Sequence, residues 1–144
     1  MLSFFTRSWN DSDWRVRERA AQRLKDRSKL LHLALSDIAT EVRLAAVKSL
    51  SDEEDLAQVV RNGACEKSRG LALSRLTSSD RLLQLAAHTE LAPELRCRAI
   101  HALPPDVPTD SLYSDRDPVP VKVALTERMQ TQPLLQRIAA DETD

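Results

Sequence analysis

Apolar positions recur along this chain in a register of 26 residues, interrupted by a single step of 27. Within each register, the spacing i, i+3, i+4 predicts two short amphipathic helices. Leu56, Val59 and Val60 mark one such helix, and Ala72 and Leu76 mark the longer helix that follows it. A register of this length is typical of helical arrays in which each unit buries its apolar face on its neighbours.

Five columns of residues keep this register across successive units of the chain. The columns are Val16, Val42, Ser68, Leu95 and Val121; Arg17, Arg43, Arg69, Arg96 and Lys122; Ala20, Ala46, Ala72, Ala99 and Leu125; Leu24, Leu50, Leu76, Leu103 and Met129; and Leu33, Val59, Leu85, Leu112 and Ile138. Four columns are small or aliphatic, and one is basic in every unit. The agreement predicts an all-α fold, a right-handed α-solenoid of about five short helical hairpins.

The spacing also predicts one domain over residues 1–144. The units are expected near 2–25, 28–50, 53–76, 79–103 and 109–130, with a closing helix near 132–140. Connections of only a few residues make successive helices antiparallel. We expect Gly63 to end one helix with a positive φ and Pro120 to delay the last long helix by one turn.

Bulky residues gather at the start of the chain. They are Leu2, Phe4, Phe5, Trp9 and Trp14. Because the terminal unit of a repeat array lacks a neighbour, these residues are expected to form a cap over the end of the core. A contribution to a partner site is the alternative.

The composition supports closely packed helices: it is 42% hydrophobic and 3% aromatic, with two glycines. The net charge of −1 does not favour a nucleic-acid binder, which normally has a basic excess. The apolar run at the N-terminus is too short for a signal peptide, and no stretch has the length of a membrane span. Together with two cysteines that we expect to be reduced, these features predict a cytoplasmic protein.

The basic column, here called the arginine ladder, consists of Arg17, Arg43, Arg69, Arg96 and Lys122. On a helical wheel, these residues fall inside the apolar arc. A charge placed there must be paired or must bond main-chain carbonyls. Acids stand six residues earlier in three units, at Asp11, Asp37 and Glu90. The ladder is therefore interpreted as a structural brace of the turns, and a basic rail for phosphates is the alternative.

An acid in the turn followed by Val-Arg-x-x-Ala-Ala-x-x-Leu resembles HEAT-like repeats, and the segment from Glu41 to Leu50 is close to that pattern. The short register is similar to compact bacterial repeats of the phycobilin-lyase and leucine-rich variant types. The resemblance covers residues 16–140 and implies a binding scaffold more than any one activity. Leucine-rich variant proteins carry an iron–sulfur cluster on a Cys-rich segment that this chain lacks, so no cofactor is expected.

In HEAT-like arrays the second helix of each hairpin lines the concave face, which implies where a partner would lie. An apolar strip of Leu44, Ala45, Leu71 and Val123 falls on that side of the wheel. The charged rim around it consists of Arg15, Glu41, Lys48, Lys67, Glu94, Arg98 and His101. An apolar strip with a polar rim is a binding signature, although tight curvature could bury the strip instead.

No arrangement of catalytic residues is evident in the sequence. Cys97 and His101 lie four residues apart on one helix face, and an ordinary helix surface is the simpler interpretation. We therefore expect a non-enzymatic scaffold that binds a protein or peptide segment, with no metal. The alternatives are a HEAT-like DNA-lesion glycosylase, a lyase or chaperone-type accessory protein, and a capping subunit of a larger assembly.

Overall fold

The structure is a computed structural model that describes residues 8–141, and only the backbone of residues 134–141. The described residues form helices and turns without a strand, which confirms the all-α prediction for this part of the chain. The elements are η1 (Ser8–Asn10), α1 (Trp14–Arg23), α2 (Arg27–Ser36), α3 (Thr40–Ser49), α4 (Glu53–Asn62), α5 (Glu66–Ser74), α6 (Ser79–Ala87), α7 (Pro93–Ala102), η2 (Asp110–Leu112) and α8 (Val119–Asp141). They fall into two compact units that divide after Leu76.

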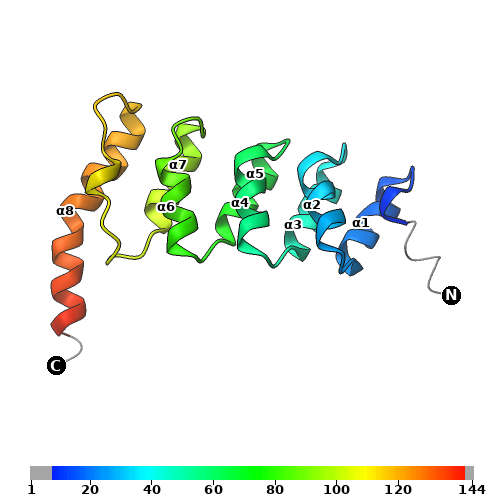
Figure 1. Cartoon of the computed structure of the whole chain (residues 1–144), viewed down its shortest axis with the longest axis horizontal. Helices are drawn as coiled ribbons and strands as arrows, with labels where there is room; N and C mark the ends of the chain where they lie inside the picture. The colour runs from blue at the N-terminus through cyan, green and yellow to red at the C-terminus, as the bar shows by residue number, and fades with distance from the viewer. Residues whose placement is uncertain (1–7, 142–144) are drawn as a thin grey trace. The chain divides into compact units, whose positions relative to one another are not determined.

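In the N-terminal unit, the helices pack in two rows. Helix α3 packs on α1, α2 and α5, and α4 packs on α2 and α5 (Figure 1). Apolar columns of the register supply the core between the rows, where Val42, Leu50, Val59 and Val60 are buried. Removing such aliphatic side chains from water is the main stabilising contribution to a small helical core.

The C-terminal unit repeats the pairing with fewer elements. Helix α7 packs on α6 and α8, and η2 packs on α8. Leu82, Leu85, Ile100 and Leu125 are buried between these elements. The prolines before residue 109 predict that the next first helix is shortened to about one 3₁₀ turn near Leu112, and η2 confirms this.

The first helices of three hairpins begin at residues that keep the same register. The side chain of Asp26 accepts a hydrogen bond from Lys29 N, that of Asp52 from Glu54 N and Asp55 N, and that of Ser78 from Arg81 N. These bonds satisfy main-chain donors that have no partner within the helix. The capping column therefore fixes where α2, α4 and α6 start.

Two expectations about helix ends are wrong. Gly63 ends α4 with a φ of −60°, so it does not use the left-handed region. The position instead needs a small residue, because an added Cβ would lie 2.6 Å from Val59 O. Pro120 does not delay α8, which begins at Val119. Proline has no N–H group, but the N–H groups of the first helical turn have no acceptor within the helix, so no helical hydrogen bond is lost.

The separate closing helix expected near 132–140 is also absent. Helix α8 runs without a break from Val119 to Asp141 and includes Pro133 (Figure 1). A proline inside a helix removes one hydrogen bond and often bends it, yet does not have to end it. Pro133 is exposed, so the carbonyl that loses its partner can be solvated.

The aromatic cap is described only in part. Trp9 and Trp14 are half-buried, and the Trp9 ring lies edge-on to His32 of α2, with 6.0 Å between ring centroids. Leu2, Phe4 and Phe5 lie outside the described residues. The contact with His32 places Trp9 against the first helix of the next hairpin, as a cap requires.

Candidate functional site

Arg17 joins two successive turns of the N-terminal unit. Its Nε donates to Asp37 Oδ2 at 2.8 Å and its NH2 donates to Asp37 Oδ1 at 2.9 Å. NH1 donates to the main-chain carbonyls of Asp11 and Ser12. Burial raises the pKa of Asp37, but the hydrogen bond from Arg17 and the other favourable contacts outweigh it, so the net shift is downward. A fork-shaped pair of this kind fixes orientation as well as distance.

Arg96 makes the corresponding contact in the C-terminal unit. Its NH1 donates to Asp117 Oδ1 at 2.8 Å, and its Nε donates to Ala86 O. Both side chains are almost fully buried. Asp117 Oδ2 is buried without a partner, and the pair borders a pocket of about 500 Å³ that Thr89 and Ser111 also line.

The remaining members of the ladder bond main-chain carbonyls, and Arg43 also bonds one side-chain hydroxyl. Arg43 NH1 donates to Asp37 O, and its NH2 donates to Thr40 Oγ1 at 2.7 Å. Arg69 Nε donates to Val60 O at 2.7 Å, and Lys122 Nζ donates to Asp115 O at 3.4 Å. All five side chains therefore point into turns of the protein.

The carboxylate partners differ from those that the sequence suggested. The acids six residues earlier were expected to pair with the ladder, but Asp11 and Asp37 offer their carbonyl oxygens to Arg17 and Arg43. The carboxylate comes from the turn of the following hairpin, as Asp37 does for Arg17. The guanidinium of Arg17 lies between the two turns, so that one nitrogen bonds the carbonyls of its own turn and the other two bond the carboxylate of the next turn.

Two further arginines with a similar role were missed from the sequence. Arg75 NH1 donates to Val47 O, and Arg128 NH1 donates to Leu103 O at 3.0 Å and its NH2 to Val107 O at 3.2 Å. Each bonds carbonyls near the end of the preceding hairpin, where helical C=O groups lack partners. Their shared column, directly before Leu76 and Met129, was the signal that could have identified them.

The apolar strip is only partly accessible. Leu44 on α3 and Leu71 on α5 are half-buried, and Val123 on α8 is 48% exposed. Ala45 is buried, with 6% of its surface exposed, so its expected exposure is wrong. It lies on α3, which packs on three other helices, and the crowding around α3 covers a side chain as small as alanine.

The charged rim is divided between the two units. Glu41 and Lys48 on α3 and Lys67 on α5 are exposed in the N-terminal unit. The rim residues of the C-terminal unit, all exposed on α7, are Glu94, Arg98 and His101. Arg15 on α1 lies over the Trp14 ring at 4.8 Å. Arg15, Glu41, Lys48 and Lys67 therefore lie in the same unit as Leu44 and Leu71, and of these four only Glu41, Lys48 and Lys67 lie on α3 or α5 with the two leucines.

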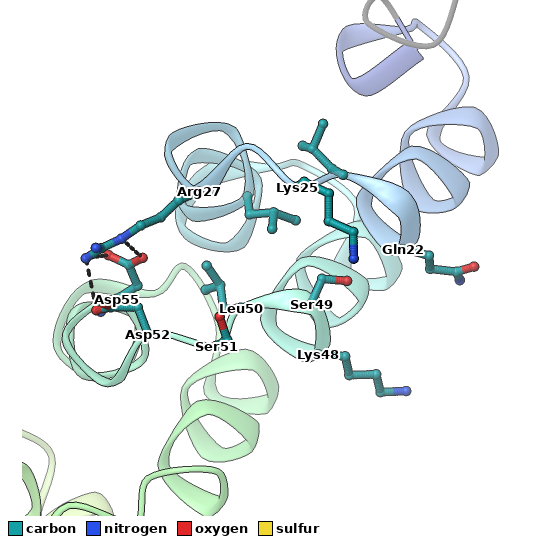
Figure 2. A pocket seen from close by; sticks show the side chains of 11 residues that line it. Gln22, Lys25, Arg27, Lys48, Ser49, Leu50, Ser51, Asp52 and Asp55 are labelled. Carbon is teal, nitrogen blue, oxygen red and sulfur yellow. Dashed lines mark hydrogen bonds and ion pairs between the residues drawn. The ribbon is translucent and has the colours of Figure 1, made fainter.

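A pocket of about 470 Å³ lies beside α3 in the same unit (Figure 2). Its walls come from the last turns of α1 and α3 and the first turns of α2 and α4, with Leu30 and Leu50 among its apolar lining. Figure 2 shows Arg27 on one side and Lys25 and Ser49 on the other, with Lys48 pointing outward. The pocket therefore combines an apolar floor with basic side chains.

One basic group of this pocket is already neutralised. Arg27 Nε donates to Asp55 Oδ2 at 2.5 Å, and its NH2 lies 2.9 Å from Asp52 Oδ1. Burial leaves Asp55 only 2% exposed, so its charge is taken up by this ion pair. The side chains of Lys25 and Lys48 are exposed and basic, which favours an anionic group at the pocket mouth.

The Cys97 and His101 pair does not form an activated thiolate. Burial raises the pKa of the Cys97 thiol, and the nearby charge of Glu94 raises it further. Among residues 8–141, no cluster of three or more His, Cys, Asp or Glu side chains could hold a metal ion. Within the same part of the chain, no helix has both the length and the apolar character needed to cross a membrane.

Comparisons with known proteins add no relative to this picture. No family model, no curated protein and no solved structure matches the chain.

Proposed function

We propose that this chain is a HEAT-like helical-repeat scaffold, a right-handed α-solenoid of about five hairpins that binds a segment of another protein without catalysing a reaction. Helix pairing supports the proposal, because second helices pack on second helices inside each unit. The arginine ladder supports it too, since Arg17, Arg43 and Arg96 are buried and bond groups inside the protein. Such side chains brace turns and are poorly placed to form a rail for phosphates.

The observation that carries the binding site is a repeated pairing of leucine with lysine. Leu44 and Lys48 are four residues apart on α3, and Lys67 and Leu71 are four residues apart on α5. Residues at this spacing share one helix face. Because α3 and α5 pack together, the unit presents two half-buried leucines, each with an exposed lysine one turn away.

The chemistry of this face selects a class of partner. A half-buried leucine offers apolar area to an aliphatic or aromatic side chain, and the adjacent lysine attracts a carboxylate. Lys48 also lines the pocket beside α3, so an acidic residue bound there would lie near Lys25 as well. The proposed partner is therefore a peptide segment in which apolar residues alternate with Asp or Glu.

A display library of random peptides, selected on the purified chain, tests the proposal without knowledge of the native partner. We expect enrichment of peptides that combine apolar and acidic residues, and loss of their binding in the variants Leu44→Ser and Leu71→Ser. Arg116→Ala is the matched control, because Arg116 is exposed in the C-terminal unit and should not affect binding.

Circular dichroism of each variant separates loss of the site from loss of the fold. If Leu44→Ser and Leu71→Ser unfold as readily as Leu50→Ala, the two leucines belong to the core and the proposed site is wrong. Enrichment of basic peptides, or tighter binding of a DNA oligonucleotide than of any selected peptide, would contradict the proposed partner class.

A further inference from the structure

Cys65 occupies the N-cap position of α5. Its backbone is extended, and its side chain is half-buried. The thiol Sγ lies 3.3 Å from Ser68 Oγ, and Ser68 is fully buried. The N-terminus of a helix carries a partial positive charge and unpaired N–H groups, which stabilise an anion placed there.

A buried arginine acts on the same thiol. Arg43 of α3 is 8% exposed, and its positive charge is near enough to Cys65 to favour the thiolate. Its NH1 and NH2 donate to Asp37 O and Thr40 Oγ1, but its Nε is buried without a partner. A buried N–H donor without an acceptor costs free energy, and a negatively charged neighbour would satisfy it.

Comparison of two turns shows what is missing beside Arg43. The equivalent Nε of Arg17 donates to the carboxylate of Asp37 in the following turn. One register later, the position of Asp37 is taken by Gly63, where a Cβ would lie 2.6 Å from Val59 O. No acid fits there, and Cys65, two residues further along the same turn, is the titratable side chain on which the charge of Arg43 acts.

The balance of contacts favours the thiolate of Cys65. Burial raises its pKa, but hydrogen bonding with the side chain and main chain of Ser68 and the positive charge of Arg43 outweigh burial and lower it. The other charged groups nearby are Glu66 and Lys67, which are exposed on α5, and Arg69, whose Nε bonds Val60 O. Cys97, equally half-buried, has its pKa raised by burial and by Glu94.

We propose that Cys65 is a modification site, a thiolate held by Arg43 and the N-terminus of α5 that reacts with small hydroperoxides. In this reaction the thiolate sulfur attacks one peroxide oxygen, an S–O bond forms and the O–O bond breaks. The sulfur gives up two electrons to the O–O bond, and the departing oxygen takes the proton of the newly formed sulfenic acid, so the products are a sulfenate and a molecule of water or alcohol. The sulfenate oxygen is formed beside Arg43, where it takes the place that a carboxylate holds beside Arg17.

Single-cysteine variants of the full chain test this proposal. Cys97→Ser leaves only Cys65, and Cys65→Ser leaves only Cys97 as the matched control. The rate of alkylation by iodoacetamide is measured against pH. We expect the midpoint for Cys65 to lie below the ordinary thiol value of about 8.5 and the midpoint for Cys97 to lie above it.

A second measurement addresses the oxidation itself. Each variant is treated with hydrogen peroxide in the presence of dimedone, which traps sulfenic acids, and the adduct is located by peptide mass spectrometry. We expect the adduct on Cys65 and little on Cys97. Equal labelling of both thiols, or a midpoint for Cys65 at or above that for Cys97, would overturn the proposal.

The source of the reactivity is tested in the Cys97→Ser background. Arg43→Met should raise the alkylation midpoint of Cys65, because it removes the guanidinium. Ser68→Ala, a smaller change, should raise the midpoint as well and decides the question if the Arg43 variant fails to fold. A folded Ser68→Ala protein with an unchanged midpoint and unchanged dimedone labelling would overturn the assigned site.

Discussion

At the scale of single residues, loss of the buried ion pair between Arg17 and Asp37 should be strongly destabilising. Removing one partner of a buried pair leaves the other charge without compensation, which costs about 3–5 kcal/mol. We expect Arg17→Ala to lower the free energy of unfolding by about 3 kcal/mol or more. Urea unfolding followed by the fluorescence of Trp9 and Trp14, which lie in the same unit, measures this change.

The exposed Arg19 provides the control, since its only described hydrogen bond goes to Arg15 O on the surface. Arg19→Ala should change the free energy of unfolding by less than about 0.5 kcal/mol. Equal effects of the two substitutions would mean that the Arg17 pair does not stabilise the turn.

The same pair predicts how stability depends on pH. The pKa of Asp37 lies below its ordinary value of 3.8 in the folded chain. The contribution of Asp37 to the free energy of unfolding is therefore complete when the pH is above the ordinary pKa, and it is lost as the pH falls through the folded-state pKa. Urea unfolding of the wild type at a series of acidic pH values should show this loss. Asp37→Asn should be less stable near neutral pH and should lose less on acidification.

At this scale the sequence could predict that the ladder arginines turn inward, but not which groups meet them. The wheel position of Arg17 required a partner, and the acid that the repeat suggested was Asp11, six residues earlier. The side chain reaches Asp37, 20 residues away, because packing of hairpins brings the next turn closer than the chain suggests.

At the scale of helices, the capping column should determine how firmly each first helix begins. The Asp52 side chain accepts hydrogen bonds from Glu54 N and Asp55 N. Its replacement by alanine should cost about 1 kcal/mol from the cap, with a further loss from the contact with Arg27. Ser78→Ala removes a neutral cap from α6 and should cost about 1 kcal/mol without any salt dependence.

Thermal unfolding followed by circular dichroism, at low and high salt, measures both substitutions. Of the two capping residues, only Asp52 pairs with Arg27. The salt-dependent difference in melting temperature between the two variants therefore reports the ion-pair part of the Asp52 effect. If neither substitution lowers the melting temperature, the capping column does not set the start of these helices.

The end of α4 gives a steric prediction. A Cβ at position 63 would lie 2.6 Å from Val59 O and 2.9 Å from Arg69 Cγ. Gly63→Ala should therefore destabilise the chain by about 1–3 kcal/mol, because the main-chain oxygen cannot move away easily. Ala64→Ser, at the adjacent exposed position, should be nearly neutral in the same urea titration. A stabilising Gly63→Ala substitution would mean that this turn relaxes freely.

The helical register identified the elements because local and long-range signals agree for most of them. The periodic leucines and the caps Asp26 and Asp52 mark helices that the structure contains. The errors arise where a residue has two allowed roles. Gly63 serves for its size and not for a positive φ, and Pro120 lies in the first turn of α8 and does not delay it.

At the scale of the whole molecule, the periodicity predicted the helix pairs, but side-chain exposure depends on packing that a wheel does not contain. Ala45 and Leu44 are neighbours on α3, yet the alanine is buried and the leucine is half-buried. The pocket that includes Lys25 and Lys48 was also unpredictable, because the ends of four helices form it. The sequence could suggest the rim, and only the structure shows which rim residues share a unit.

Charge at this scale gives the last prediction. The chain has a net charge of −1, so an acidic peptide has no overall attraction to it and must bind through local basic groups. Lys67 is exposed one turn from Leu71, and Lys67→Glu should weaken an acidic peptide selected on the chain about tenfold, or 1.4 kcal/mol. Arg116→Glu changes the net charge equally in the other unit and should alter the affinity by less than about twofold.

Fluorescence anisotropy of the labelled peptide measures both variants at low and high salt. Added salt should weaken binding to the wild type more than binding to Lys67→Glu, because the variant has already lost the screened attraction. If Arg116→Glu weakens the peptide as much as Lys67→Glu does, the attraction comes from net charge and not from the face formed by α3 and α5. A peptide that binds Lys67→Glu as tightly as the wild type would place the partner elsewhere on the molecule.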